Sequence, residues 1–257
     1  MLLNKEFIQQ KIANPNIELE LFNNIDSTNN YLKQNISTKR RICISESQSN
    51  GKGSKLNRTW HSPFGQNIYM SYAYYFKKNI NDLSGLSLVV SMAMLAAIKE
   101  IGIAANIMLK WPNDGMYKKR KLMGNLIESQ IISPKETVAI IGMGINVNML
   151  NAEKDDISQA WTSLKAIIGE DINRNLLCVS LVHNLNAYLE QFNKYGLREF
   201  ILKWQQVDML YDQEVLLDNG KIKGIAKGID EQGNLLLHLA NQEIISNAAG
   251  DVSIFKI

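Results

Sequence analysis

Two lysines, a carboxamide and a carboxylate stand close together in the stretch KWPNDGMYKKRKLMGNLIE, which spans residues 110–128. The apolar residues 107–109 before it predict a buried strand, and the Pro-Asn-Asp-Gly cluster at 112–115 predicts a turn. A second buried strand is expected from about Leu122, with Gly124 near its start, where a missing side chain allows close approach to the backbone. Because α/β proteins place ligands at the ends of adjacent buried strands, the sequence predicts a binding site here.

The side chains expected at this site are Lys110, Asn113, Asp114 and Lys121. Lysines beside an approachable backbone suit an anionic ligand such as a phosphate or carboxylate, because fixed cations and N–H donors stabilise charge on oxygen. A polar hairpin with a solvated KKRK run at 118–121 is the competing interpretation, and the stretch alone leaves both open.

A second candidate for anion binding is the loop QSNGKGSKLNRTW at 48–60, which carries Lys52, Lys55 and Arg58 among glycines. It is not a P-loop, because no glycine stands four residues before a Gly-Lys-[Ser/Thr] triplet, and it lacks the third glycine of a dinucleotide-binding fingerprint. It is either a solvated loop or a mobile one that orders over a ligand, with Trp60 anchoring its far end.

Two further segments combine polar groups with an exposed backbone. Asp26 or Ser27 is expected to cap a helix running to about Asn35, and helix starts also bind polar ligand groups. The sequence GMGIN at 142–146 ends a predicted buried strand, and its Asn146 offers a donor and an acceptor to a base edge. A simple cap and simple packing are the alternatives.

The elements that must position these residues follow from periodicity and turn residues. Helices are predicted over 5–13, 84–101, 158–168, 174–195 and 197–206, and strands over 17–22, 41–47, 67–76, 137–148 and two or three places within 105–132. About five short strands between 214 and 257 predict a small β-barrel. We therefore expect a large domain over residues 1–206 and a small one over residues 207–257.

Composition is that of an ordinary globular protein: 257 residues, 46% hydrophobic and 21% charged, with a net charge of +3. Cys43 and Cys178 are far apart, which fits a reducing compartment better than a disulfide scaffold. No signal peptide is recognisable, and the apolar run 83–98 falls short of the ~20 residues that span a bilayer. We expect a soluble cytoplasmic protein. With only three histidines in the chain, a histidine triad or a metal site is not expected.

Four motifs in this order resemble the biotin protein ligases: DSTN at 26–29, the Gly/basic loop ending at Trp60, KWPND…KLMG at 110–124, and GMGIN at 142–146. The terminal segment ending in GDVSIF matches as well, so that the resemblance covers roughly residues 22–255. It implies an α+β fold: a class II synthetase-like mixed sheet with flanking helices, followed by an SH3-like barrel. Bifunctional members carry a helix-turn-helix domain before DSTN, and only 25 residues precede Asp26 here. A monofunctional ligase without a DNA-binding domain is expected.

The resemblance implies chemistry in two half-reactions. Biotin attacks the α-phosphate of ATP, giving biotinoyl-5′-AMP and pyrophosphate, with Mg²⁺ accompanying the nucleotide. A lysine of the biotin carboxyl carrier protein of acetyl-CoA carboxylase then takes the biotinoyl group. No DNA or membrane partner is expected, and a homodimer is left open.

Site roles are carried over from the family residue by residue. The resemblance implies catalytic roles for Lys121, Asp114 and Arg58. It implies biotin contacts for Ser27, Thr28, Asn29, Gln48, Gly51, Lys52, Gly53, Lys121 and Gly124. It implies contacts with ATP or the adenylate for Ser54, Lys55, Arg58, Trp60, Lys110, Asn113, Asp114, Gly144 and Asn146.

The loop departs from the family pattern GRGRxGRxW, because it reads GKGSKLNRTW and is one residue longer. The second arginine of the pattern, which helps to retain the reactive adenylate in the family, falls on Ser54 or Lys55. Our hypothesis is that Lys55 replaces it, as a point charge without the bidentate geometry of arginine.

Three other functions are compatible with parts of this pattern. A lipoyl or octanoyl protein ligase shares the fold and the adenylate chemistry, but KWPND and the terminal β domain favour biotin. A biotin-responsive regulator would need a recognition helix before residue 26. A non-catalytic nucleotide- or RNA-binding module finds little support, since the predicted barrel has no aromatic platform for stacking bases.

Overall fold

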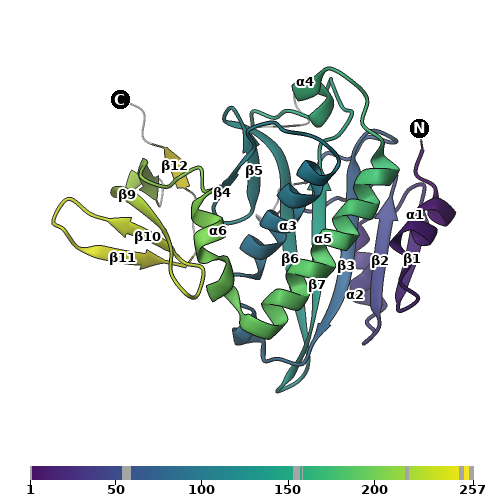
Figure 1. Ribbon diagram of the computed structural model, residues 1–257, viewed down its shortest axis with the longest axis horizontal. Coiled ribbons are helices and arrows are strands. Elements are labelled where there is room, and N and C mark those ends of the chain that lie inside the picture. Colours follow the sequence, from purple (N-terminus) through teal and green to yellow (C-terminus); the bar gives the residue numbers. More distant parts are fainter. Residues whose placement is uncertain are drawn as a thin grey trace.

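A seven-stranded mixed sheet forms the centre of the larger part of the chain (Figure 1). The computed structural model describes residues 2–53, 59–152, 157, 159–217, 220–248 and 252–254. The strand order is β1-β2-β3-β7-β6-β5-β4, and only β1 and β2 pair in parallel. Their bounds are β1 Ile17–Phe22, β2 Arg40–Ser45, β3 Ile68–Phe76, β4 Met108–Lys110, β5 Asp114–Tyr117, β6 Arg120–Ser133 and β7 Glu136–Ile145.

Helices cover both faces of this sheet. Helices α3 (Leu86–Glu100) and α5 (Arg174–Tyr195) lie side by side on one face, where they enclose the main core (Figure 1). Helix α2 (Thr28–Gln34) packs on the other face through Leu32. Alternation of side chains assigns neighbouring residues of one strand to the two layers, so Tyr72 belongs to the α3/α5 core and Ala73 to the α2 layer. Helix α1 (Lys5–Ile12) contacts α5 and β1.

Helix α3 is the most apolar element of the larger part. Together with the preceding 3-10 turn η1 (Ile80–Leu83) it makes a helical stretch, Ile80–Glu100, long and apolar enough to cross a membrane by length and composition. That stretch is longer than the apolar run 83–98 considered in the sequence, and its helical part α3 corresponds to the helix predicted over 84–101. Most of it is buried inside the protein, as expected for a core helix that contacts α5 and β6.

A separate antiparallel sheet of five strands, ordered β11-β10-β9-β8-β12, forms the C-terminal part. Its strands are β8 Glu214–Leu217, β9 Ile222–Ile229, β10 Leu235–His238, β11 Ile244–Asn247 and β12 Val252–Ile254. The predicted α+β class, with a mixed sheet and a small C-terminal β unit, is therefore confirmed. The division into domains at residue 207 stays a prediction; helix α6 (Ile201–Gln205) and β8 lie on either side of that point.

The two sheets meet at strand β4 and the residues that follow it. The Leu109 N–H donates to the Val207 carbonyl and the Met209 N–H to the Leu109 carbonyl, both at 2.7 Å. The Trp111 indole N–H donates to the Gly233 carbonyl at 2.9 Å, which connects the KWPND segment to a turn of the small sheet. KWPND is thus held from both sheets.

Two predicted elements need correction. Residues 114–117 form strand β5, which lies between β4 and β6. The two buried strands predicted at 107–109 and from about Leu122 are therefore not neighbours. The turn predicted at 112–115 ends before Asp114, where β5 begins. The helix predicted over 158–168 is reduced to α4 (Leu164–Ile168). Its expected first half pairs with β6 instead: the Lys121 N–H donates to the Ala160 carbonyl and the Thr162 N–H to the Lys121 carbonyl, both at 2.9 Å. These backbone bonds to a distant strand replace helical ones.

Asp208 is a buried carboxylate at the junction of the two sheets, only 4% exposed. Burial raises the pKa of Asp208 to about 6, although the hydrogen bond from the Leu210 N–H and the neighbouring Trp204 act in the opposite direction. The folded protein therefore holds this proton at pH values where the unfolded chain has released it. Above pH 6 the ionised carboxylate destabilises the fold by about 3 kcal/mol, at roughly 1.4 kcal/mol per pKa unit.

We predict that Asp208→Asn raises the free energy of unfolding at pH 8 by about 1–3 kcal/mol, because the amide keeps an acceptor for Leu210 without the buried charge. The gain should shrink as the pH falls from 6 towards 4, where the wild-type carboxyl is neutral in the folded state. Urea unfolding at pH 8 and pH 4.5 measures both values. The same gain at the two pH values would contradict a raised pKa.

Candidate functional site

A pocket opens where the start of α2, the loop after β2 and the strands β6 and β7 come together. Polar side chains and glycines make up most of its wall. The lining residues are Ser27, Thr28, Asn29, Gln48, Lys52, Gly53, Trp60, Asn113, Lys121, Gly124, Asn125, Leu126, Gly142, Met143 and Gly144.

The start of α2 forms one wall and is fixed by hydrogen bonds to the loop after β2. Ser27 is the N-cap, and its hydroxyl oxygen accepts from the Asn30 N–H at 3.4 Å. The Thr28 N–H and hydroxyl both donate to Oε1 of Gln48, at 2.9 and 3.1 Å, and the Gln48 amide donates to Ser62. Both ends of the loop are thereby tied to the helix cap.

Asn29 is buried and held on both sides of its amide. Its Nδ2 donates to Oε2 of Glu128 at 2.9 Å, and its Oδ1 accepts from the Ser71 hydroxyl at 2.5 Å. The side chain rests on Gly142, where an added Cβ would meet Asn29 Cγ at 2.9 Å. This amide consequently has one fixed orientation in the pocket.

Glu128 connects the α2 wall to the basic loop. Its carboxylate accepts from Lys33 at 2.7 Å and lies 3.6 Å from the ammonium nitrogen of Lys52. Burial would raise the pKa of Glu128, but the hydrogen bonds from Lys33 and Asn29 and the charge of Lys52 hold it below the ordinary value. Glu128 therefore stays ionised and draws Lys52 towards the pocket.

The opposite wall carries an ion pair between Lys121 on β6 and Asp114 on β5. Lys121 Nζ lies 2.6 Å from Asp114 Oδ1, and both side chains lie over Gly124, where an added Cβ would approach them at 3.2–3.4 Å. Lys110 is opposite Asp114 across the β4–β5 pair. Burial lowers the pKa of Lys110, Asp114 partly offsets this, and the charge of Lys121 lowers it further. Two lysines and one carboxylate therefore interact at this edge of the pocket, and of the three only Lys121 lines it.

Trp60 closes the pocket on the β7 side. Its ring lies directly on Gly144, in space that a Cβ would fill, and 5.4 Å from the Lys121 ammonium nitrogen. The Trp60 N–H donates to the Gly51 carbonyl at 2.8 Å, and Lys52 pairs with Thr59 in an antiparallel bridge. The two arms of the basic loop therefore run side by side.

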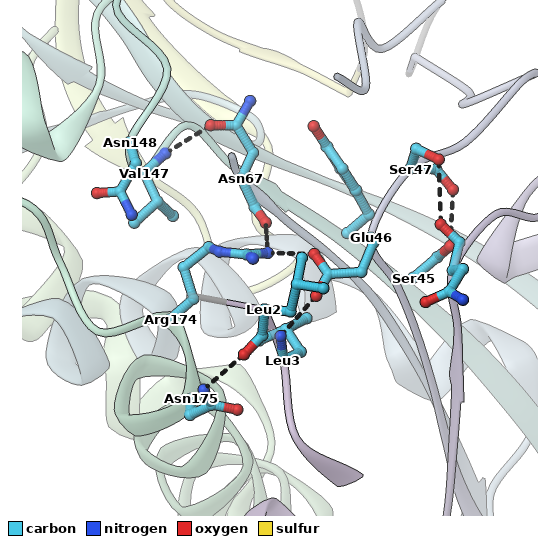
Figure 2. A network of polar contacts seen from close by, with 12 residues as sticks. Leu2, Leu3, Ser45, Glu46, Ser47, Asn67, Val147, Asn148, Arg174 and Asn175 are labelled. Atoms are coloured by element: carbon cyan, nitrogen blue, oxygen red, sulfur yellow. Dashed lines mark hydrogen bonds and ion pairs between the residues drawn. The ribbon is translucent and has the colours of Figure 1, made fainter. Parts of the chain in front are cut away.

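A buried ion pair anchors the base of this loop (Figure 2). Glu46 follows β2 directly, and its Oε2 accepts from Arg174 of α5 at 2.7 Å while its Oε1 accepts from the Leu3 N–H at 2.5 Å. Arg174 also donates to the carbonyl of Asn67, and the Asn67 side chain accepts from the Val147 N–H. The ends of β2 and β7 and the start of β3 are therefore connected through one set of polar contacts.

The structure brings most of the predicted site residues together. Those that line the pocket are Ser27, Thr28, Asn29, Gln48, Lys52, Gly53, Trp60, Asn113, Lys121, Gly124 and Gly144. Asp114 joins them through Lys121, whereas Asn146 lies outside the lining and donates to the Thr162 carbonyl at 3.0 Å. Gly51 and Lys110 also lie outside the lining. The predicted residues Ser54, Lys55 and Arg58 lie outside the described part of the chain.

Sequence reasoning missed four residues at or beside the pocket: Asn125, Leu126, Glu128 and Met143. Gly142 lies in the GMGIN segment, where an accessible backbone was expected. A signal for two of the missed residues was present in the spacing. Leu126 and Glu128 follow Gly124 at intervals of two along a strand, which places them on the same face, and Gly142 precedes Gly144 in the same way. The register confirms this pairing, with Gly124 opposite Gly144 and Leu126 opposite Gly142.

This arrangement suits an elongated ligand with an anionic group. Amide and hydroxyl groups at the α2 end can hydrogen-bond a neutral polar head, and the Lys121–Asp114 wall can hold negative charge. Gly142 and Gly144 lie between the two ends, with the Asn29 side chain resting on the first and the Trp60 ring on the second. Among the residues that the structure describes, no group of three or more His, Cys, Asp or Glu side chains is arranged to hold a metal ion.

Comparisons with known proteins give matches over most of the chain. Residues 21–146 match the model of the biotin/lipoate A/B protein ligase family, and residues 214–254 match that of the biotin protein ligase C-terminal domain. The bifunctional ligase/repressor BirA of Salmonella typhimurium is 38% identical over 217 residues, which are 83% of this chain and 67% of that protein. The biotin–[acetyl-CoA-carboxylase] ligase of Mycobacterium tuberculosis is 27% identical over 82% of this chain and 77% of its own. The structure of an Aquifex aeolicus biotin protein ligase in complex with biotin and ATP superposes with a TM-score of 0.77 at 28% identity, covering 93% and 99% of the two chains.

The Asn29–Gly142 contact yields a test of the pocket geometry. We predict that Gly142→Ala lowers the free energy of unfolding by about 1–3 kcal/mol, because Asn29 is held by Ser71 and Glu128 and has nowhere to move. Gly124→Ala is the matched control on the neighbouring strand, where the new Cβ meets only the flexible end of Lys121 and Asp114. Urea unfolding of both variants decides the matter: equal losses would mean that Asn29 is not the constraint.

Proposed function

Because this chain belongs to the biotin protein ligase family, we propose that it transfers biotin to a specific lysine of a biotin carboxyl carrier protein through biotinoyl-5′-AMP. That the chain is a ligase follows from its relatives, and the Aquifex aeolicus structure binds biotin and ATP. The single observation that carries the finer proposal is the Lys121–Asp114 pair, which lies over Gly124 at the edge of the polar pocket.

In the first half-reaction, a carboxylate oxygen of biotin attacks the α-phosphorus of ATP and the bond to pyrophosphate breaks. Two negative groups must meet for this to occur. The proposed role of Lys121 is to lie between them, reducing their repulsion and stabilising the charge that develops on the phosphorus oxygens. Its ion pair with Asp114 and its backbone bonds to residues 160 and 162 support this role, because they fix its position beforehand.

In the second half-reaction, the carrier amine attacks the acyl carbon of the adenylate and AMP leaves. Asp114 is the proposed group that orients this amine or accepts its proton. Biotin is proposed to bind with its ureido head at Ser27, Thr28, Asn29 and Gln48, where the fixed amide of Asn29 supports a directional contact. The loop residues Gly51, Lys52 and Gly53 would lie along it, and Gly124 would leave room for its tail.

For the nucleotide, the proposed contacts are Trp60, Lys110, Asn113, Gly144 and Asn146. Trp60 lying on Gly144 places a flat ring beside the Lys121 wall, which supports an adenylate on the β7 side. The side-chain amide N–H of Asn146 already donates to the Thr162 carbonyl. Asn146 can therefore contact a base edge through its side-chain oxygen, or through its N–H once this hydrogen bond has broken. The phosphate contacts expected of Ser54, Lys55 and Arg58 remain predictions from the resemblance.

Mg²⁺ is proposed to arrive with the phosphates of ATP, whose charge it neutralises when bound. The two carboxylates beside the pocket, Asp114 and Glu128, are both engaged by lysines, which fits an ion held mainly by the nucleotide and not by a protein cage. A cytoplasmic location fits the two buried free thiols of Cys43 and Cys178. No DNA or membrane partner is part of this proposal.

A lipoyl or octanoyl ligase is the competing function, because the model that matches residues 21–146 is shared by biotin and lipoate ligases. The match of residues 214–254 to the C-terminal domain of biotin protein ligases favours biotin. The deciding measurement is ATP–pyrophosphate exchange with biotin, lipoate or octanoate as the acid. We expect exchange with biotin alone. Exchange with lipoate or octanoate instead would transfer the chain to the sister group, and no exchange with any acid would refute adenylation.

We predict that Lys121→Ala lowers the rate of biotin-dependent exchange about 10²–10³-fold, the usual loss, roughly 2.7–4 kcal/mol, on removing one fixed charge-stabilising donor. The fold should be retained, since the side chain is near the surface of the pocket. Lys165→Ala is the control, because that lysine lies on α4, has an ion pair with Asp171 and does not line the pocket. Near-normal exchange by Lys121→Ala would remove Lys121 from the mechanism.

A further inference from the structure

The turn between β5 and β6 presents three consecutive cations that the proposed chemistry does not use. Lys118, Lys119 and Arg120, named here the cationic hairpin, are all exposed. None of them forms an ion pair with a carboxylate in the part of the chain that the structure describes. The ammonium nitrogen of Lys118 lies 5.3 Å from the centre of the Tyr117 ring.

The backbone of this turn is unfavourable for the residues that occupy it. Lys118 and Lys119 both have positive φ angles, 47° and 65°, and Tyr117 pairs with Arg120 across the turn. These features define a two-residue type I′ hairpin, in which Asn-Gly is strongly preferred because both central residues are left-handed. Two lysines at such positions carry a steric cost, so local folding preference does not explain their presence.

An adaptable apolar groove adjoins the cationic hairpin. It is lined by Asn106, Met108, Met116, Tyr117, Lys118, Lys119 and Met209. The three methionines come from β4, β5 and the junction with the small sheet, and each is half-buried. Methionine, tyrosine and arginine are enriched in protein–protein interfaces, and methionine adapts its shape to a partner. A cationic rim beside a methionine floor therefore suits a folded protein with an acidic surface better than it suits a nucleic acid.

The groove and the turn belong to the same hairpin as the reacting centre. Met116 is opposite Lys121 in the register, and Arg120 directly precedes Lys121 on β6. A folded acceptor is much wider than the lysine side chain that it must insert into the pocket. Any acceptor that delivers a lysine amine to Lys121 and Asp114 must consequently rest on the surrounding rim.

We propose that the cationic hairpin and its methionine groove are a docking surface for the acceptor protein, which they engage through carboxylates flanking its target lysine. This inference rests on the proposed function, since it assigns a place to the acceptor of the second half-reaction. Docking there would raise the rate of encounter and fix the orientation of the incoming lysine, which are the usual effects of complementary charge at an interface rim.

The main test measures transfer to a recombinant apo biotin carboxyl carrier domain of a bacterial acetyl-CoA carboxylase. The variant is K118E/K119E/R120E, and the matched control is K194E/R198E/K203E, which makes the same change in net charge on α5, η2 (Leu197–Phe200) and α6. We expect the hairpin variant to raise the KM for the carrier at least tenfold at low salt, with a smaller effect at high salt. Biotin-dependent pyrophosphate exchange should stay within twofold for both variants.

A second variant separates docking from folding. Lys118→Asn with Lys119→Gly installs the residues that a type I′ turn prefers, so its melting temperature should exceed that of the wild type. Its KM for the carrier should nevertheless rise, because two cations are lost. Neutralising the carboxylates beside the target lysine of the carrier should abolish the difference between this variant and the wild type.

Several results would overturn the proposal. An unchanged KM in K118E/K119E/R120E, or an equal rise in the control variant, would show that the hairpin is not the docking surface. A short DNA duplex that binds as tightly as the carrier does would be a competing ligand. If K118E/K119E/R120E then lost binding of the duplex but kept binding of the carrier, the surface would be a nucleic-acid contact. Titration of fluorescent carrier against the protein measures docking without catalysis. If the wild type binds the carrier but shows no pyrophosphate exchange, the proposed function is contradicted and the docking surface is not.

Discussion

The buried ion pair between Glu46 and Arg174 is the contact on which the geometry of the pocket depends (Figure 2). Its side chains are only 2% and 1% exposed, so each charge needs the other and the remaining lone pairs need donors. The Leu3 N–H supplies one such donor, and the Asn67 carbonyl accepts from the same arginine. Because Glu46 stands two residues before Gln48, this arrangement fixes the point from which the loop beside the pocket starts.

Much of the fold could be predicted because strands and helices with a buried face carry their own periodicity. Strand β1 and helix α5 lie where the pattern places them. The failures share one cause. Residues 114–117 become a strand only by pairing with β4 and β6, and residues 160–162 are extended because their backbone bonds to Lys121. Hydrogen bonds to partners distant in sequence leave no local signal in composition or spacing.

The same distinction applies to the site. Motif residues such as Lys121, Asn29 and Trp60 were predictable because their types and spacing resemble those of a family. Glu128 was missed, and the contact of Gly142 with Asn29 could not be predicted, since the sheet register and the placement of α2 create both contacts. The spacing of Gly142 and Gly144 predicted close approach to the backbone, but it did not identify the side chain that lies there.

The segment that carries Lys121 and Asp114 is flanked by two features that reduce stability. On one side Asp208, whose carboxylate is buried, forms an isolated backbone bridge with Leu109. On the other side lies the left-handed backbone of Lys118 and Lys119. A sequence selected only for folding would avoid both, because consistent local choices favour a single stable fold. Such departures are tolerated at functional sites when a large hydrophobic core offsets the stability that they cost. Here the core enclosed by α3 and α5 does so. Both features lie beside the Lys121–Asp114 pair. Their position therefore supports a role in recognition for the β5–β6 hairpin and for the junction of the two sheets, at some cost in stability.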